Sequence, residues 1–474
     1  MRGHPRALSL LVLLVVAVAR AAAGDAALLP GTIVPKVICT AHPEQSYALY
    51  LPSAYTPEKR WPIIYIFDPA ARGLLPTKIF KEAAEQYGYI LATSNNAKNG
   101  PLRPEMEAAA ALWDDTHLRL AIDNQRVYAA GFSGGARLAS HIAETCKCLH
   151  GAFLSGAGFA VDGRPERANA FPVFLTAGFL DFNYGELVRL DDQLSSLNIP
   201  HFLRRFEGAH EWAPPVVWSE ALAWMNLEAM KDKRLPRDDA AIAREFERFR
   251  SAAKEVEKGG DIYLAARAFR QAAEAFEGLT ATDSLRERAS DLEKNPWYHL
   301  GEKHEREDLS TEASLEGEIL GLTRALREPG ADRTQLQQQA SERIVDLRNR
   351  ALDEKKEEKK RVLERARRGV FAALIESGEP LIDQKRLAQA EAYLALAVEA
   401  RPEIPWPYLS LARCLLLMGR KKDALDSLER AKGAGLTAQE LADLLTEVPE
   451  FRALAGDLRF QKLVEGKQPA TEAR

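Results

Sequence analysis

The sequence is poor in cysteine, with four in 474 residues. They are too few for a disulfide scaffold and too scattered for a four-ligand zinc site. Excess charge is also nearly absent, because 64 lysines and arginines stand against 68 acidic residues. Without an excess positive field, we expect no nucleic acid among the partners. The remaining composition, 46% hydrophobic and 28% charged, is typical of globular domains, and at roughly 100 to 200 residues each the length suggests about two to four.

Long hydrophobic runs are equally scarce, and the clearest one lies at the N-terminus. Arg2 and Arg6 precede apolar residues 7–19, and alanines occupy 21–23. This pattern predicts a signal peptide over residues 1–24 and a periplasmic or secreted protein. The run is shorter than the roughly 20 residues of a spanning helix, so we expect no integral membrane span after cleavage; a retained anchor is the less favoured alternative.

Export would permit disulfides, which leaves the state of three cysteines open. Cys39 could pair with Cys146 or Cys148, or these thiols could stay free and buried. Cys414 lies in an apolar helical stretch, where we expect it to be a packing residue.

The pattern of the chain changes near residue 235. Over residues 30–232, short apolar runs alternate with helical stretches after an opening hairpin, which predicts a doubly wound, mostly parallel sheet. We expect strands at 32–40, 46–51, 62–67, 89–92, 126–130, 151–155, 172–177 and 201–206, and helices at 78–87, 104–121, 135–145, 184–197 and 217–230. Beyond the basic linker 231–236 the chain reads as an all-α, charge-rich domain. A ligand site should lie at the carboxyl ends of the strands.

One motif lies at that edge of the predicted sheet. Residues 131–135, Gly-Phe-Ser-Gly-Gly, match the G-x-S-x-G elbow that places a nucleophilic serine between a strand and a helix. A buried-strand pattern precedes the motif and a helix with small residues follows it. Ser133 is therefore the predicted nucleophile, and a tight turn with an exposed serine is the alternative.

A serine hydroxyl needs a base to remove its proton and an acid to orient that base. His210 follows the carboxyl end of the last predicted strand, whereas His201 opens that strand at the opposite edge. Asp181 follows the preceding strand, whereas Asp191 and Asp192 lie on a predicted helix, where we expect a solvated pair. His210 is the predicted base and Asp181 the predicted acid.

The order Ser133, Asp181, His210 is the one that the α/β-hydrolase fold requires. Residues 30–230 resemble an α/β-hydrolase esterase, near polyhydroxybutyrate depolymerases, feruloyl esterases and carboxylesterases. The elbow, Gly178-x-x-Asp181 and Gly208-x-His210-x-Trp212 carry this resemblance. It implies hydrolysis of a small or polymeric ester through an acyl-enzyme intermediate, with no metal or organic cofactor.

The resemblance also implies an oxyanion hole built from main-chain amides. One would come from Gly134 and the second from Ala70 or Ala71, although loop 68–73 lacks the His-Gly or Gly-Gly run of many esterases. Asp68 and Arg72 could simply pair to hold that loop. Residues 156–171 are too short for a folded cap, which implies an open cleft.

Three residues are predicted substrate contacts: Trp212, Phe132 and Asn95. Asn96 and Asn99 share the loop of Asn95 and could also hydrogen-bond a substrate, although such asparagine-rich loops are more often plain turns.

The helical half contains an internal repeat. Ala390, Leu394 and Ala397 recur 34 positions later as Ala424, Leu428 and Ala431, which is the tetratricopeptide period. The pattern resembles tetratricopeptide repeats over 377–466, with a further unit at 240–279 inside the helical region 239–376. Such repeats commonly bind peptides, so a protein partner is expected. The charged stretch 352–368 is expected to be a solvated helix.

Three functions of different class follow from these observations. The favoured one is an exported serine esterase with a helical-repeat domain for protein interaction or assembly. The alternatives are a catalytically inactive hydrolase-fold scaffold that binds protein, and a serine peptidase of the same fold.

Overall fold

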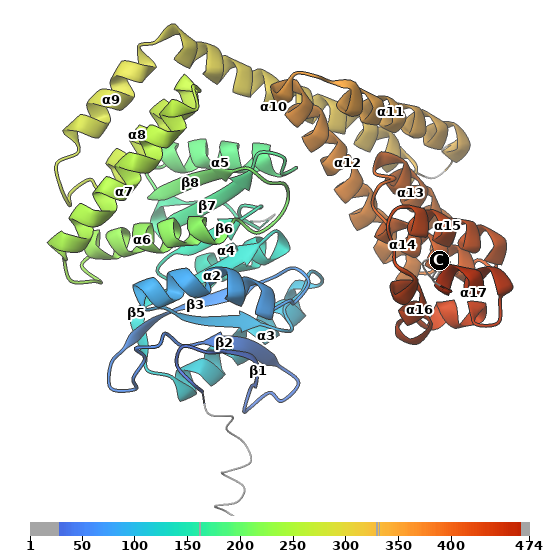
Figure 1. Cartoon of the computed structure of the whole chain (residues 1–474), viewed down its shortest axis with the longest axis horizontal. Coiled ribbons are helices and arrows are strands. Elements are labelled where there is room, and N and C mark those ends of the chain that lie inside the picture. The colour runs from blue at the N-terminus through green and yellow to red at the C-terminus, as the bar shows by residue number, and fades with distance from the viewer. Residues whose placement is uncertain (1–27, 161–162, 329, 331, 466–474) are drawn as a thin grey trace, which may run out of the picture. The chain divides into compact units, whose positions relative to one another are not determined.

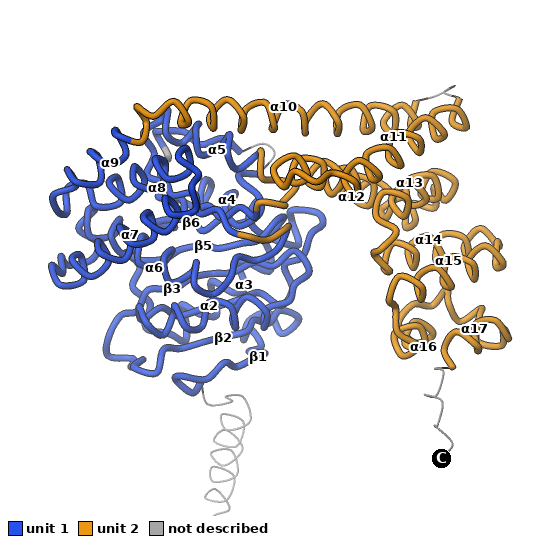
Figure 2. The backbone as a smooth tube through the Cα atoms, turned by 45° about the horizontal axis from the view of Figure 1, so that its top comes forward, with its two compact units in different colours: residues 1–178, 186–206, 210–291 blue, residues 179–185, 207–209, 292–474 orange. Residues whose placement is uncertain are grey.

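The computed structural model describes residues 28–160, 163–328, 330 and 332–465 (Figure 1), so the predicted signal peptide lies outside the described residues. The chain divides into two compact units (Figure 2). Unit 1 comprises residues 1–178, 186–206 and 210–291, and unit 2 comprises residues 179–185, 207–209 and 292–474. The predicted catalytic domain 30–232 therefore falls in unit 1, apart from two short loop segments.

An eight-stranded sheet forms the centre of unit 1, in the order β1-β2-β4-β3-β5-β6-β7-β8. The strands are β1 (Ile33–Ile38), β2 (Ser46–Tyr50), β3 (Trp61–Phe67), β4 (Ile90–Ser94), β5 (Ile122–Phe132), β6 (Ala152–Ser155), β7 (Val173–Gly178) and β8 (His201–Phe206). β2 pairs antiparallel with β1 and with β4, and all other pairs are parallel. The prediction of eight strands in a mostly parallel sheet is confirmed, and the arrangement is consistent with an α/β-hydrolase fold.

Helices cover both faces of this sheet, because right-handed crossovers place α2 on one face and α3, α4 and α5 on the other. In agreement, α2 packs against α6, and α3 packs against α4. The bounds are α2 (Leu74–Tyr87), α3 (Leu102–Arg119), α4 (Gly134–Cys146), α5 (Tyr184–Ser196) and α6 (Pro215–Lys231). Every residue of β3 and β4 is buried, which explains why these strands read as continuous apolar runs.

Three further helices belong to unit 1: α7 (Asp239–Lys258), α8 (Ile262–Ala275) and α9 (Asp283–Glu293). Phe249 of α7 packs edge-on against Phe202 of β8, with ring centroids 5.6 Å apart. The predicted linker is also bonded to the α/β part, since Arg234 Nη1 donates to the His150 carbonyl at 3.1 Å. The contact of Phe249 with Phe202 covers β8, the last strand of the sheet.

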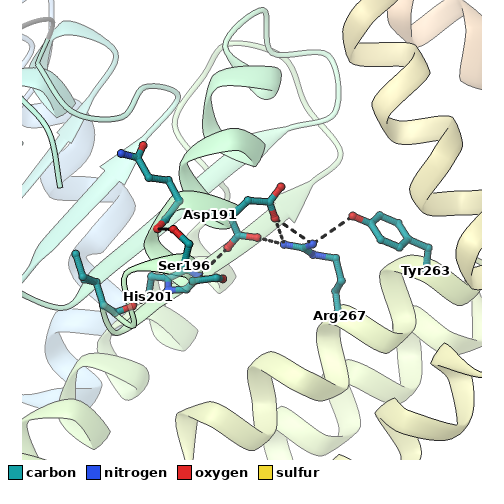
Figure 3. A network of polar contacts seen from close by, with 9 residues as sticks. Asp191, Ser196, His201, Tyr263 and Arg267 are labelled. Carbon is teal, nitrogen blue, oxygen red and sulfur yellow. Dashed lines mark hydrogen bonds and ion pairs between the residues drawn. The ribbon is translucent and has the colours of Figure 1, made fainter. Parts of the chain in front are cut away.

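A buried polar network joins α8 to α5 and β8 (Figure 3). The Asp191 side chain is 1% exposed and pairs with Arg267 of α8, which also lies 3.3 Å from Asp192 Oδ1. The expectation of a solvated aspartate pair is therefore wrong for Asp191, whereas Asp192 is 64% exposed. Arg267 lies about 75 residues from these aspartates in sequence. The pattern of residues around the aspartates therefore could not predict this partner.

His201 completes this network at the amino end of β8, on the edge opposite to Phe132. Its Nδ1 lies 2.7 Å from the Ile199 carbonyl, and its Nε2 lies 3.3 Å from Asp191 Oδ1 and 3.0 Å from Ser195 Oγ. Burial by itself lowers the pKa of His201, but the hydrogen bond and charge of Asp191, together with the Ile199 carbonyl, raise that pKa above its usual value. Burial would raise the pKa of Asp191, yet His201 and Arg267 hold it below its usual value. The geometry therefore favours an imidazolium–carboxylate pair.

Unit 2 is a helical region with one continuous apolar core. Its helices are α10 (Pro296–Ala325), α11 (Arg333–Asp353), α12 (Glu357–Asp383), α13 (Leu387–Ala400), α14 (Trp406–Leu417), α15 (Lys421–Gly433), α16 (Ala438–Glu447) and α17 (Leu458–Val464). The expectation that 352–368 is a solvated helix is wrong for its last turns, because Glu364, Arg365 and Arg367 are buried.

The cysteines differ from one of the expected arrangements. Cys146 and Cys148 form a disulfide with each other, at the C-terminus of α4. Cys39 is free and buried, as the second of the two open alternatives has it, whereas the Cys146–Cys148 pair belongs to neither alternative. Cys414 is also free and buried, which confirms it as a packing residue.

Replacement of His201 tests the buried network through its pH dependence. Because the pKa of His201 is raised in the folded state, its contribution to stability is complete below the unfolded pKa of about 6.5 and is lost as pH rises through the folded pKa. His201→Gln should lower the free energy of unfolding by about 1–3 kcal/mol near pH 6, and the deficit should shrink toward pH 9.

Urea unfolding of both proteins across this pH range measures the difference. His299→Gln serves as the control, because this histidine side chain is 71% exposed and should change stability by less than about 0.5 kcal/mol. A His201→Gln deficit that stays constant from pH 6 to pH 9 would contradict the charged pair.

Candidate active site

Ser133 lies at a sharp turn between β5 and α4, as the motif predicts. Its backbone φ is 54° and ψ is −122°, a left-handed conformation that a residue with a side chain rarely adopts. The Ser133 amide donates to the Ser155 carbonyl of the next strand at 2.9 Å. Such strained residues persist only where the surroundings hold them, and they cluster at functional sites.

The glycines of the elbow are required by the close approach of α4 to the sheet. A Cβ on Gly131 would lie 2.0 Å from the Gly135 carbonyl oxygen, and one on Gly135 would lie 2.1 Å from the Phe67 carbonyl oxygen. Both contacts are with backbone atoms, which cannot swing aside. Any side chain at these positions would push the helix off the strands and move Ser133.

The structure brings Ser133 and the predicted base together. His210 Nε2 lies 2.9 Å from Ser133 Oγ, within hydrogen-bond distance. The ring of Phe132 packs on the imidazole with centroids 4.6 Å apart. His210 is half-buried, so the imidazole is held between this ring and the serine while one side remains open.

Asp181, the predicted acid, is fully buried three residues beyond the end of β7. Its Oδ1 accepts a hydrogen bond from the Asn183 amide at 2.8 Å. Gly178 and Phe206, the last residues of β7 and β8, are paired in register. The Leu180 amide also donates to the Gly208 carbonyl at 2.9 Å. The loops that carry the predicted acid and base therefore begin side by side and are bonded to each other.

Two arginines of α12 hold these loop segments within unit 2. Arg365 Nη1 donates to the Phe179 carbonyl at 3.2 Å, and its guanidinium lies 4.7 Å from the centroid of the Tyr184 ring. Arg365 also forms a buried pair with Glu312 of α10, with Nε 2.6 Å from Oε2. Arg361 Nη2 lies 3.1 Å from Glu207 Oε1 in the other loop. These contacts could not be predicted from the sequence, because the arginines lie in a charged run more than 150 residues from the loops.

Asp68 organises the loop after β3. Its carboxylate accepts hydrogen bonds from Arg72 at 2.8 and 2.9 Å and from the Trp212 indole at 2.9 Å. Burial alone would raise the pKa of Asp68, but the hydrogen bonds from Arg72, Trp212 and the Ala70 amide hold it below its usual value. The predicted Asp68–Arg72 pair is confirmed, and the same carboxylate ties the loop after β3 to the loop after β8.

The three predicted substrate contacts are mostly engaged in packing or hydrogen bonds. Trp212 and Phe132 are 8% and 6% exposed, and their ring centroids lie 5.6 Å apart. The Asn95 side-chain amide donates to the Pro35 carbonyl at 3.2 Å. The geometry favours positioning roles for Trp212, Phe132 and Asn95, and direct contact with a substrate stays a prediction.

Both loop amides predicted for the oxyanion hole already donate within their loop. The Ala70 amide donates to Asp68 Oδ1 at 2.9 Å, and the Ala71 amide donates to the Asp68 carbonyl at 2.9 Å. Gly134 is the first residue of α4, where a backbone amide lacks an intrahelical partner. Of the predicted amides, Gly134 is therefore the better placed donor.

The part of the chain that the structure describes has neither a metal-binding cluster nor a membrane-spanning helix. It contains no cluster of three His, Cys, Asp or Glu residues suited to hold a metal ion. Among the same residues, no helix is long and apolar enough to cross a membrane.

Comparisons with known proteins give structural similarity at low identity. No known family model and no curated protein matches the chain. The fluorophosphonate-binding serine hydrolase F of Staphylococcus aureus is similar at 14% identity with a TM-score of 0.35, over 41% of this chain and 98% of that one. A ferulic acid esterase is similar at 14% identity with a TM-score of 0.34, over 41% of this chain and 95% of that one. Esterase B of Lactobacillus rhamnosis is similar at 14% identity with a TM-score of 0.34, over 48% of this chain and 98% of that one.

Gly131→Ala tests the close approach at the elbow. The added Cβ would meet the Gly135 carbonyl at 2.0 Å, so we expect a loss of about 2–4 kcal/mol in the free energy of unfolding. Gly317→Ala on α10 is the matched control, since a Cβ there meets nothing within 4 Å and should stabilise by about 0.5–1 kcal/mol. Equal stability of Gly131→Ala and the parent in denaturant unfolding would refute this packing argument.

Proposed function

We propose that the protein is an exported serine hydrolase that cleaves a carboxylic ester through an acyl-enzyme intermediate. The observation that carries the proposal is the 2.9 Å hydrogen bond between His210 Nε2 and Ser133 Oγ at a strained strand-to-helix turn. A serine becomes nucleophilic when a base within hydrogen-bond reach takes its proton. The serine hydrolases and esterases of known structure match only part of this chain, and at low identity. The support for the reaction therefore comes from the geometry of the site.

In the proposed first half-reaction, Ser133 Oγ attacks the acyl carbon while its proton moves to His210 Nε2. The carbonyl π electrons move to oxygen, where the Gly134 amide donates a hydrogen bond to the oxyanion. Collapse of this intermediate breaks the bond to the leaving alkoxide, which takes the proton from His210. The products are a free alcohol and an acyl ester of Ser133.

In the second half-reaction, water attacks the acyl-enzyme along the same route. His210 takes a proton from water, and the carboxylic acid leaves as Ser133 recovers its proton. Asp181 is assigned the orientation of the imidazole and stabilisation of its charged form, a role that fits a fully buried carboxylate next to the β7–β8 strand ends. The reaction as written needs water and no cofactor.

We further propose that the helices of unit 2 support the predicted acid, Asp181. Arg365 contacts the segment that begins with Phe179 and carries Asp181, and Glu312 fixes Arg365. Both charged side chains are 6% exposed, so their geometry is well determined by packing. A displaced acid loop would take Asp181 from its assigned role, because small misplacements of a catalytic group cost up to about 100-fold in rate.

The helical unit also fits a repeat surface for a protein partner. Helices α13 and α15 begin at Leu387 and Lys421, the 34-residue period of tetratricopeptide repeats. Ala390 and Ala424, which the period relates, are both fully buried where paired helices pack closely. Binding of a partner to this surface and export by the predicted signal peptide 1–24 are both parts of the proposal.

Ser133→Ala tests the reaction most simply. We expect loss of 10⁴-fold or more in kcat for p-nitrophenyl acetate, because roughly this factor is lost when a triad nucleophile is removed. His210→Ala should behave similarly, and His201→Ala, at the opposite edge of the sheet, should retain activity. Activity of Ser133→Ala within tenfold of an active, matched parent would contradict Ser133 as the nucleophile, and a folded parent without activity would favour the inactive scaffold. Hydrolysis of peptides in preference to esters would favour the peptidase.

Arg365→Gln tests the support of the acid loop. The variant loses the charge that pairs with Glu312, so we expect kcat/KM for the same ester to fall about tenfold to 100-fold. The matched control is Arg343→Gln, which breaks an exposed pair with Glu318, 59% and 50% exposed, and should change the rate less than twofold. Parental kcat/KM in Arg365→Gln would show that the helices only appose the loop.

A further inference from the structure

Of the three amides predicted for the oxyanion hole, the Gly134 amide alone is well placed to donate to the oxyanion. Stabilisation of a tetrahedral intermediate generally uses two or more preorganised donors aimed at the developing charge. The Gly134 amide can be one of them, whereas the amides of Ala70 and Ala71 already donate to Asp68. A second donor should therefore come from another residue near Gly134.

Asn99 lies directly against Gly134. A Cβ on Gly134 would come 1.9 Å from Asn99 Oδ1, 2.7 Å from Cγ and 3.0 Å from Nδ2. The whole carboxamide thus occupies the space that a side chain would fill at the residue after Ser133. The position after the nucleophile is free for Asn99 because it is a glycine.

The backbone fixes Asn99 at this place. Its amide donates to the Pro69 carbonyl at 2.8 Å, and the preceding Lys98 pairs with Ala70 in an isolated antiparallel bridge. The loop after β4 is therefore bonded across the loop after β3. This pairing holds the Asn99 side chain next to Gly134 of the elbow, where it remains exposed to solvent.

Asn99 differs from the two other asparagines of its loop. Asn95 Nδ2 donates to the Pro35 carbonyl at 3.2 Å, and Asn96 Nδ2 donates to the Glu44 carbonyl at 3.1 Å. Among the described residues, no hydrogen bond engages the Asn99 carboxamide. Its NH₂ group has two donors, and rotation about the Cβ–Cγ bond can present either face of the amide to a ligand.

We propose that Asn99 is a catalytic residue whose Nδ2–H donates to the oxyanion together with the Gly134 amide. The inference rests on the proposed function, since it assigns a role in the attack of Ser133 on an acyl carbon. A carboxamide has no charge, and its N–H protons are too weakly acidic to be transferred, so hydrogen-bond donation is the chemistry that it offers. It would replace the loop amide predicted at Ala70 or Ala71.

Kinetics of Asn99 variants with p-nitrophenyl acetate test this role. Asn99→Ala should lower kcat by about 10²- to 10³-fold with KM changed less than threefold, because the oxyanion forms only after binding. Asn99→Asp, of the same shape, removes the donor and adds negative charge, so its loss should be at least as large. Lys98→Ala, an exposed neighbour in the same loop, should keep the parental rate.

The outcomes separate this inference from the proposed function. An active parent with Asn99→Ala and Asn99→Asp both within threefold of its kcat, and with parental circular dichroism, overturns the role of Asn99 alone. A loss confined to KM also overturns it, since that marks a substrate contact. A parent without activity toward esters overturns the proposed function, and this inference with it.

Discussion

The site depends on the close approach of one helix to the sheet. The backbone of α4 lies so near β3 and β5 that Gly131 and Gly135 have no room for a Cβ. Ser133, the residue between β5 and α4, has a positive φ of 54° in this close approach. It lies directly after the carboxyl end of β5. The positions of Ser133, of the Gly134 amide and of the space that Asn99 fills all depend on this close approach of α4 to the strands.

Buried charges hold the loops around this turn in place. Asp68 accepts hydrogen bonds from two loops, one after β3 and one after β8, and its low pKa keeps it charged and able to accept them. In unit 2, Arg365 bonds the segment that carries Asp181 and is itself fixed by Glu312. At the opposite edge, His201 and its partners hold α8 rather than serve chemistry. The same residue types thus hold the fold together at one end of the strands, and the proposed function assigns them to the reaction at the other.

Elements of the fold whose structure a single local pattern decides could be predicted from the sequence. Buried parallel strands are apolar runs, and the order of the elbow serine, Asp181 and His210 along the chain matches the strand ends. The start of β5 at Ile122 was predicted too late, because polar residues follow it. The start of α2 at Leu74 was also predicted too late, because Pro76, which a first turn tolerates, suggested a break. The burial of Arg365 could not be predicted, because its partner on α10 is 53 residues away. Charged side chains look solvated until their distant partners are known.

The most direct measurement is the position of a covalent adduct on the purified chain. A fluorophosphonate reacts with a serine only when a neighbouring base activates it, so the probe reports on the Ser133–His210 pair without any assumption about the natural substrate. We expect a single adduct that peptide mass spectrometry locates on Ser133, and none in the His210→Ala variant. An unlabelled parent, or an adduct on another serine, would contradict it.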